Sequence, residues 1–277
     1  METQLLHEKL IARNYSRSTQ RTYLSCFKAF LHYFKGEEIA DLRQAQLEHY
    51  FYTLAHSGMS TSTLNQHINS VKFYYEKVLR KNRNTYVFDR PKKGFNLPNV
   101  LSVNEMQSVL KNIHNLKHLS MIALLYACGL RIGELICLQI KDVDSQRMQL
   151  FIHAGKGKRD RYVPLDAKML RLLRNYYKAY RPEIYLFNGQ HCPQYSPTSV
   201  RKILKLACKK TSIQKKVTPH TLRHSYATHL LEDGIDLRYI QVLLGHQSVK
   251  TTEIYTHVKS IKINEIVSPF SKLSLTW

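Results

Sequence analysis

Residues 88–99, FDRPKKGFNLPN, constrain the fold more than any other stretch of this 277-residue chain. They combine two prolines, one glycine and three cations without apolar periodicity, which is typical of a linker. A length of 277 residues suits one large or two modest domains, and 43% hydrophobic content is enough for a core. We therefore expect a helical domain at residues 1–87, a linker at 88–99 and a second domain at 100–277.

The segment before the linker has the apolar spacing of amphipathic helices. Residues 16–88 predict three or four helices, with Ser18 and Asp41 as N-caps and a third run that begins near Ser62. Their aromatic residues recur at helical spacing, as Tyr23 and Phe27 do, and we expect them to form a core.

The pattern changes beyond residue 100. Ser102 and Glu105 form a capping-box pattern, and HLSMIALLYACGLRIGELICL predicts a buried helix that is broken at Gly129. Residues 147–164 alternate strand-forming residues around a turn rich in glycine and lysine, which predicts a hairpin or a three-stranded sheet. The expected fold is mainly α with a small antiparallel β-sheet, in two domains.

Charge indicates the kind of partner. The chain has 42 Lys and Arg against 20 Asp and Glu, a net charge of +22. Up to Asn99 there are 15 basic and 8 acidic residues (+7), and after it 27 and 12 (+15), so the excess is not a basic tail. Two basic domains joined by a linker favour a clamp around double-stranded DNA.

Other partners and compartments are less well supported. No run of 18 apolar residues is present and the N-terminus has no signal-peptide pattern, so we expect a cytoplasmic protein without a membrane partner. The five cysteines are scattered without a C-x-x-C pair, which argues against disulfides and a zinc ribbon.

Two cations in the second domain are candidates for binding a phosphate. Arg131 follows Gly129 in an apolar context, where it either pairs internally with Glu134 or is oriented by Glu134 toward a phosphate. Lys156 lies between two glycines in AGKGKRDR, where it either reaches a scissile phosphate or belongs, with Arg161, to a solvated basic hairpin tip.

The segment TPHTLRHSYATHLLEDG, residues 218–234, predicts an anion site at a helix N-terminus. Thr218 is a suitable N-cap, and His220 and Arg223 share one face of the first turns. His220 and His224 have the spacing of zinc ligands, but Thr221 replaces the glutamate of a metalloprotease motif and no third ligand is evident. We therefore expect no metal.

The segment LLGHQSVKTTEIYTHV adds a histidine and a tyrosine. Gly245 should end a helix that begins near Asp236, with His246 directly after it and Tyr255 in a following helix. Taken alone, Tyr255 fits a core position as well as a catalytic one.

Together these groups describe phosphoryl transfer without metal or cofactor. Arg131 and Arg223 would neutralise the phosphate oxygens, and Tyr255 would attack phosphorus and become linked to DNA. The other groups would assist: Lys156 protonating the departing 5′-oxygen, His220 helping to deprotonate the tyrosine, and His246 donating a hydrogen bond to the phosphate.

At these residues the chain resembles the tyrosine recombinases, the phage integrase family, especially Xer-like and transposon-type members. The matching blocks are ACGLRIGELICL, AGKGKRDRYVPL, TPHTLRHSYATHLLEDG and IQVLLGHQSVKTTEIYTHV, in the order of the family. The resemblance spans about residues 120–260 and is weaker in YSRSTQRTYLSCFKAFLHYF, which is similar to the helical core-binding domain of the family.

The resemblance implies a site-specific DNA recombinase that acts through a 3′-phosphotyrosyl intermediate. Its catalytic set would be Arg131, Lys156, His220, Arg223, His246 and Tyr255, with Glu134 supporting the first arginine. It further implies a synaptic tetramer on two DNA sites with inverted repeats. Whether the subunits are identical or include a paralogue stays open, as does whether the C-terminal segment packs in cis or in trans.

Two alternatives remain at this stage. A type IB topoisomerase uses related chemistry without exchanging strands between partners. A non-catalytic regulator could use LLEDGIDLRYIQVLLGHQSVKTTEIY as a helix-turn-helix, although this leaves the arginines, the lysine and the tyrosine unexplained.

Overall fold

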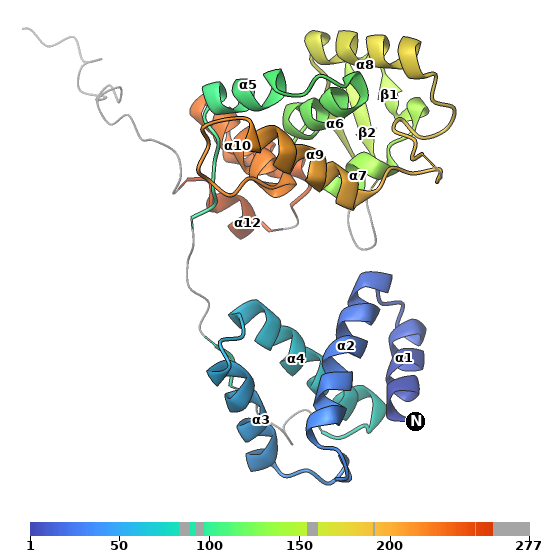
Figure 1. Cartoon of the computed structure of the whole chain (residues 1–277), viewed down its shortest axis with the longest axis vertical. Coiled ribbons are helices and arrows are strands. Elements are labelled where there is room, and N and C mark those ends of the chain that lie inside the picture. Colours follow the sequence, from blue (N-terminus) through green and yellow to red (C-terminus); the bar gives the residue numbers. More distant parts are fainter. Residues whose placement is uncertain (83–88, 92–96, 154–159, 191, 247, 257–277) are drawn as a thin grey trace, which may run out of the picture. The chain divides into compact units, whose positions relative to one another are not determined.

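The computed structural model describes residues 1–82, 89–91, 97–153, 160–190, 192–246 and 248–256 (Figure 1). The chain divides into two compact units, Met1–Phe95 and Asn96–Trp277. Lys156 and the C-terminal segment after Thr256 lie outside the described residues. In the described ranges, no helix is both long enough and apolar enough to cross a membrane.

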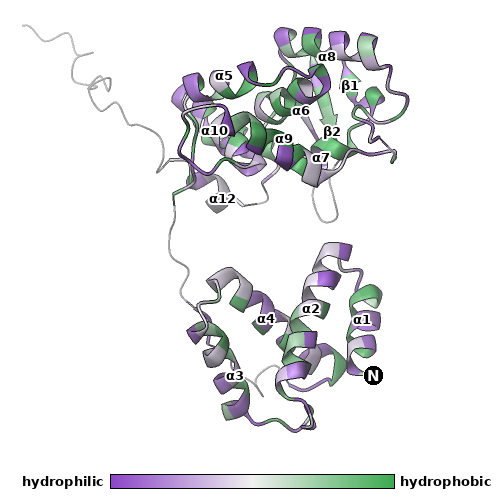
Figure 2. Cartoon of the chain, viewed as in Figure 1, coloured by the Kyte–Doolittle hydropathy of each residue, from purple (hydrophilic) through white to green (hydrophobic). Residues whose placement is uncertain are grey.

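The first unit is helical. It contains α1 (Glu2–Ala12), α2 (Arg17–Tyr33), α3 (Gln44–His56), α4 (Thr61–Phe73) and a π-helical turn at Tyr74–Val78. Hydrophobic and hydrophilic residues alternate around these helices (Figure 2), as amphipathic helices require. Their apolar sides enclose an aromatic core in which Phe27, Phe30 and Tyr50 are almost completely buried.

Two of the three predicted helix starts in this unit differ from the structure, and the third agrees with it. Ser16, not Ser18, caps α2, because its Oγ accepts the Thr19 N–H at 3.2 Å. The N-cap of α3 is Arg43 rather than Asp41. Helix α4 is capped by Ser60 and begins at Thr61, which confirms the start that was predicted near Ser62. In addition, α1 lies before residue 16, where no helix was predicted.

The described part of the predicted linker contacts the unit that it adjoins at each end. Arg90 donates to the Oδ1 atoms of Asn65 (2.9 Å) and Asn69 (2.8 Å) on α4. At the other end, Nδ2 of Asn99 donates to the carbonyl oxygen of Lys216 at 3.5 Å. A side chain near each end of this proline-containing segment thus binds the unit that it adjoins.

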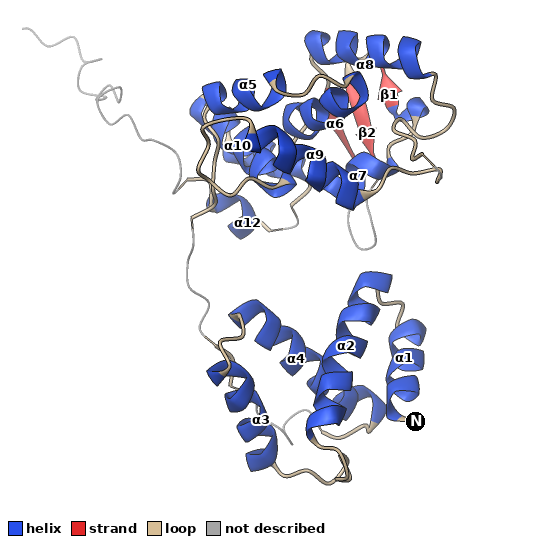
Figure 3. Ribbon diagram, in the orientation of Figure 1, coloured by secondary structure: helices blue, strands red, loops and turns tan. Residues whose placement is uncertain are grey.

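The second unit contains the predicted three-stranded sheet (Figure 3). Its strands are β1 (Val143–Asp144), β2 (Gln149–Ile152) and β3 (Arg161–Pro164), in the order β1-β2-β3 and antiparallel throughout. In the pairing of β2 with β3, Ile152 lies opposite Arg161 and Gln149 opposite Pro164. The β2–β3 connection carries the predicted Lys156 turn and lies outside the described residues.

Helices surround a main apolar core in this unit, and a smaller apolar cluster around Tyr226, Leu244 and Tyr255 lies beside it. They are α5 (Val103–Lys111), α6 (Leu116–Ala127), α7 (Ile132–Cys137), α8 (Ala167–Tyr180), α9 (Pro197–Lys209), α10 (Pro219–Glu232), α11 (Leu237–Leu244) and α12 (Lys250–Glu253), with a 3₁₀ turn at Ile140–Asp142. Helix α6 is buried from Ser120 to Leu125 and contacts α8, α9 and α10. The fold is therefore mainly α with a small antiparallel sheet, as predicted.

Several predicted helix ends in this unit are confirmed. Ser102 and Glu105 form the capping box of α5, and Thr218 caps α10 with Pro219 at its first position. Gly129 breaks the apolar run between α6 and α7 with φ at +57°, and Gly245 ends α11 with φ at +61°. Both glycines adopt the left-handed conformation that other residues disfavour.

Candidate active site

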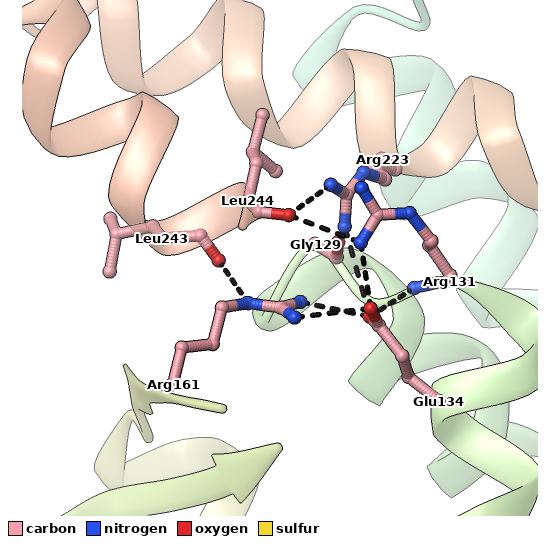
Figure 4. A network of polar contacts seen from close by, with 7 residues as sticks. All are labelled: Gly129, Arg131, Glu134, Arg161, Arg223, Leu243 and Leu244. Atoms are coloured by element: carbon pink, nitrogen blue, oxygen red, sulfur yellow. Dashed lines mark hydrogen bonds and ion pairs between the residues drawn. The ribbon is translucent and has the colours of Figure 1, made fainter. Parts of the chain in front are cut away.

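Glu134 lies at the centre of an arginine network (Figure 4). It occupies the first turn of α7, where its Oε2 accepts the Arg131 N–H at 2.8 Å. Its Oε1 accepts a hydrogen bond from Nη1 of the Arg131 side chain at 2.7 Å. The internal Arg131–Glu134 pair that the sequence left open is therefore formed, and it fixes the guanidinium at the start of α7.

A second arginine binds the same carboxylate from the sheet. Arg161, the first residue of β3, donates from Nη1 to Oε1 of Glu134 at 3.1 Å and from Nη2 to Oε2 at 2.8 Å. Its side chain is 6% exposed, so the interpretation as a solvated hairpin tip is wrong for Arg161. This bidentate pair links β3 to α7.

Burial alone would raise the pKa of Glu134. The hydrogen bonds and charge of Arg161, together with the hydrogen bonds from Arg131, outweigh that effect and lower the pKa to about 2. The carboxylate is therefore ionised throughout the physiological pH range.

The C-terminal end of α11 meets the same arginines. The carbonyl oxygen of Leu243 accepts a hydrogen bond from Nε of Arg161 at 2.7 Å. The carbonyl oxygen of Leu244 accepts hydrogen bonds from Nη1 of Arg131 at 3.3 Å and from Nη2 of Arg223. The last carbonyls of a helix have no partner within the helix and carry partial negative charge. They help to hold three like-charged guanidinium groups together.

Arg223 is the most deeply buried of the three arginines. It lies on α10, its side chain is 3% exposed, and its Nη1 donates to the carbonyl oxygen of Gly129 at 2.7 Å. The same Nη1 is 3.8 Å from Oε2 of Glu134. Burial, with the charge of Arg131, lowers the pKa of Arg223 to about 9, so the guanidinium is still charged at neutral pH.

Among the described residues that form this network, positive charge exceeds negative charge. Three guanidinium groups share one carboxylate and two helix-end carbonyls, and the Arg131 side chain is 21% exposed. Excess positive charge in a partly buried setting favours a bound anion. The network is thus suited to bind a phosphate on its Arg131 side.

The predicted histidines lie near these arginines. Burial is the main cause of the lowered pKa of both His220 and His246, and the charges of Arg223 and Arg131 lower it further. The pKa of His246 falls to about 3. Nδ1 of His246 is 2.9 Å from Oγ1 of the buried Thr252. A neutral imidazole held in this way can present a ring N–H to a phosphate.

Tyr255 is buried beside these groups. Its side chain is 1% exposed, and its ring lies 6.5 Å from that of His246, nearly parallel to it. Its Oη is 3.1 Å from Nδ1 of His224. Burial raises the pKa of Tyr255, while the charges of Arg223 and Arg131 act in the opposite direction.

The structure thus brings five of the candidate residues together: Arg131, His220, Arg223, His246 and Tyr255. Lys156, the sixth, lies outside the described residues, so its position stays a prediction. Within the described ranges, no group of three or more His, Cys, Asp or Glu side chains is placed to hold a metal ion.

Sequence reasoning missed the contacts of Arg161 and His224. A signal for Arg161 was available, because it lies two residues before the buried Val163 and must share its face of the strand. His224 was considered as a metal ligand only. Its contact with Tyr255 joins residues 31 positions apart and could not be read from local spacing.

Comparisons with known proteins agree with this geometry. Residues 99–261 match the model of the phage integrase family, and residues 3–85 match the N-terminal SAM-like domain of phage integrases. The chain belongs to the phage integrase family. It is a tyrosine-type site-specific recombinase, and the two matched segments fall within its two compact units.

Individual relatives of this phage integrase family member cover nearly its whole length. The tyrosine recombinase XerD of Oceanobacillus iheyensis is 33% identical over 285 residues, which cover 95% of each protein. The crystal structure of XerA recombinase is 27% identical, covers 100% of this chain and 99% of that chain, and has a TM-score of 0.57. A XerH site-specific recombinase bound to a palindromic difH substrate shares the fold, with 23% identity, a TM-score of 0.71, and coverage of 98% of this chain and 85% of that one.

Proposed function

We propose that this recombinase cleaves DNA with Tyr255 as its nucleophile. Phage integrase family members cut and rejoin strands through a 3′-phosphotyrosyl ester, and the arginine network beside Tyr255 is the observation that carries the assignment. The tyrosine Oη attacks phosphorus, a tyrosyl O–P bond forms and the bond from phosphorus to the 5′-oxygen breaks. Reversal of these steps by a 5′-hydroxyl rejoins the strands without ATP.

Arg131 and Arg223 bind the scissile phosphate in this proposal. Both already take part in the network around Glu134, so their guanidinium groups need little rearrangement when the phosphate arrives. Donors fixed before the reaction stabilise the charge of the transition state more effectively than mobile ones. Glu134 supports them by holding Arg131 through two hydrogen bonds.

The remaining groups move protons or bind the phosphate. Lys156 protonates the departing 5′-oxygen from the β2–β3 turn, and His246 donates a hydrogen bond to a phosphate oxygen. His220, near Arg223 at the N-terminal end of α10, assists proton removal from the tyrosine.

We further propose that the partner is double-stranded DNA with inverted-repeat sites. Support comes from the net charge of +22 and from the XerH structure with a palindromic substrate, which shares this fold. The reaction takes place in a synaptic tetramer in the cytoplasm, formed by four copies of this chain or with a paralogue.

The nucleophile can be tested before the recombination site is known. Wild type and Tyr255→Phe are incubated with sheared DNA from the source, denatured, and the protein-linked fragments are captured and sequenced at their ends. We expect one short inverted-repeat sequence to be enriched with wild type and no linked DNA with the variant. Equal recovery from both proteins would exclude Tyr255 as the nucleophile. Strand exchange between two captured sites distinguishes a recombinase from a topoisomerase.

A further inference from the structure

The hydroxyl of Tyr255 contacts a histidine outside the predicted catalytic set. Nδ1 of His224 lies 3.1 Å from Oη of Tyr255, and the two rings are 5.6 Å apart at an interplanar angle of 54°. His224 follows Arg223 on α10, so the helix that supplies a phosphate-binding arginine also supplies this partner. With Tyr255 1% exposed, bulk water has almost no access to the phenol.

The surroundings set the protonation states of both partners. Burial, with the charges of His220 and Arg223, lowers the pKa of His224 to about 4, while burial raises that of Tyr255. At neutral pH the imidazole is therefore neutral and the phenol is protonated. With the ring proton of His224 on Nε2, Nδ1 accepts the hydrogen bond from the hydroxyl, and this is the tautomer that proton transfer requires.

We propose that His224 is the catalytic residue that accepts the phenolic proton of Tyr255 when the tyrosine attacks the phosphate. This rests on the proposed function of Tyr255. As the O–P bond forms, the O–H bond breaks and its proton passes to Nδ1 of His224. The bond from phosphorus to the 5′-oxygen breaks, and that oxygen takes its proton from Lys156. In the rejoining step the proton on Nδ1 returns to the tyrosine.

The substrate itself makes this transfer favourable. An imidazolium at His224 would face the positive charge of Arg223 and lie close to His220 and His246. A phosphate bound by Arg131 and Arg223 neutralises part of that charge, and a nearby anion favours the protonated imidazole. Proton transfer is thereby tied to the presence of the scissile phosphate.

His224→Asn is the informative variant. An asparagine side chain places a hydrogen-bonding group near the position of Nδ1 but cannot accept a proton. The same helix provides a matched control, since Nδ1 of His229 lies 2.9 Å from Oη of Tyr126. His229→Asn therefore makes the same chemical change at a second histidine–tyrosine pair, which has no assigned role in cleavage.

The measurement is the single-turnover rate of covalent protein–DNA formation between pH 6 and 9. The substrate is a duplex with the captured recombination site and a sulfur in place of the bridging 5′-oxygen, so that a thiolate leaves without needing the proton of Lys156. We expect His224→Asn to be slower than wild type by about 10²-fold or more at pH 7, the usual contribution of a general base. Its rate should rise with pH as hydroxide replaces the base, whereas His229→Asn should follow wild type.

Three results would overturn the proposal. In the first, His224→Asn reacts at the same rate as His229→Asn at every pH. In the second, it reacts faster than wild type, because the hydrogen bond only restrains the tyrosine. In the third, the sulfur substrate restores the rate of His224→Asn to that of wild type, which is the result expected of Lys156→Ala. Thermal unfolding and DNA affinity report whether each variant is folded. If His224→Asn is not folded, His224→Gln replaces it, and a wild-type rate of that variant on the sulfur substrate would overturn the proposal.

Failure of the underlying function gives a different pattern. If Tyr255 is not the nucleophile, Tyr255→Phe forms as much adduct as wild type. If Tyr255 is the nucleophile and His224 is not its base, Tyr255→Phe is inactive while His224→Asn keeps the wild-type rate.

Discussion

At the scale of single residues, Glu134 determines whether three arginines can lie together. Its pKa is lowered to about 2 by Arg161 and Arg131 despite burial, so its ionised form stabilises the folded protein. The sign follows from the lowered pKa: the stabilisation is present above the ordinary glutamate pKa and is lost as pH falls toward 2. The difference between the two pKa values corresponds to about 3 kcal/mol.

We predict that Glu134→Gln lowers the free energy of unfolding at pH 7 by about 3 kcal/mol, because the amide leaves Arg161 buried without its carboxylate. The variant should also lose stability less steeply than wild type between pH 5 and 2.

Glu105→Gln is the matched control, since Glu105 also occupies a capping box and pairs with Lys215 at 2.8 Å but is 26% exposed. Its cost should be about 1 kcal/mol or less. Denaturant unfolding at several pH values measures both, and equal costs would contradict the central place of Glu134.

At the scale of elements, Gly129 connects α6 to α7 and shapes the site around Arg223. Its φ is +57°, and a Cβ at this position would lie 2.4 Å from Cδ1 of Tyr226 and 3.1 Å from Cδ2 of Leu244. Its carbonyl oxygen also accepts a hydrogen bond from Arg223. A side chain here would therefore disturb the turn and the α10–α11 packing at once.

We predict that Gly129→Ala lowers the free energy of unfolding by about 3 kcal/mol, from the left-handed backbone and the steric overlap combined. Gly133→Ala provides the comparison four residues later. Gly133 lies in α7, and a Cβ there would meet nothing within 4 Å. Alanine should stabilise that helix by up to about 1 kcal/mol. Thermal unfolding distinguishes the two, and a similar effect of both substitutions would show that Gly129 is not required.

The sequence predicted the elements of the second unit better than those of the first. Capping residues and glycines define local geometry, so the ends of α5, α10 and α11 followed from Ser102, Thr218 and Gly245. Helix α1 was missed because apolar residues lie all around it: Leu6 and Leu10 are buried while Leu5 and Ile11 are exposed. Near α2, YSRSTQ offers more than one suitable cap, and the observed bond from Thr19 to Ser16 was not distinguishable in advance.

Tertiary contacts were the part of the candidate site that the sequence could not predict. Arg161 meets Glu134 across 27 residues and Leu243 across 82, which depends on how β3 packs against α7 and α11. The packing also reaches Gly245, where a Cβ would lie 3.1 Å from Cδ and Nη1 of Arg161. Such contacts follow from the fold, and no pattern of residue spacing in the sequence predicts them.

At the scale of the whole molecule, both units carry excess positive charge. The net charge is +7 up to Asn99, with the linker included, and +15 after it. If both units contact the backbone of a duplex, several phosphates are neutralised and their condensed counterions are released. Release of counterions makes affinity depend steeply on salt, in proportion to the number of phosphates contacted.

We therefore predict that affinity for a non-specific duplex falls by roughly 10³-fold or more between 50 and 200 mM salt, as expected for six or more phosphate contacts. The measurement uses Tyr255→Phe, so that covalent trapping does not contribute, and fluorescence anisotropy at a series of salt concentrations. A logarithmic slope of about −5 or steeper indicates contacts spread over an extended basic surface. A slope near −2 would mean that only a few phosphates are bound, as by the arginine network alone, and would contradict a clamp formed by both units.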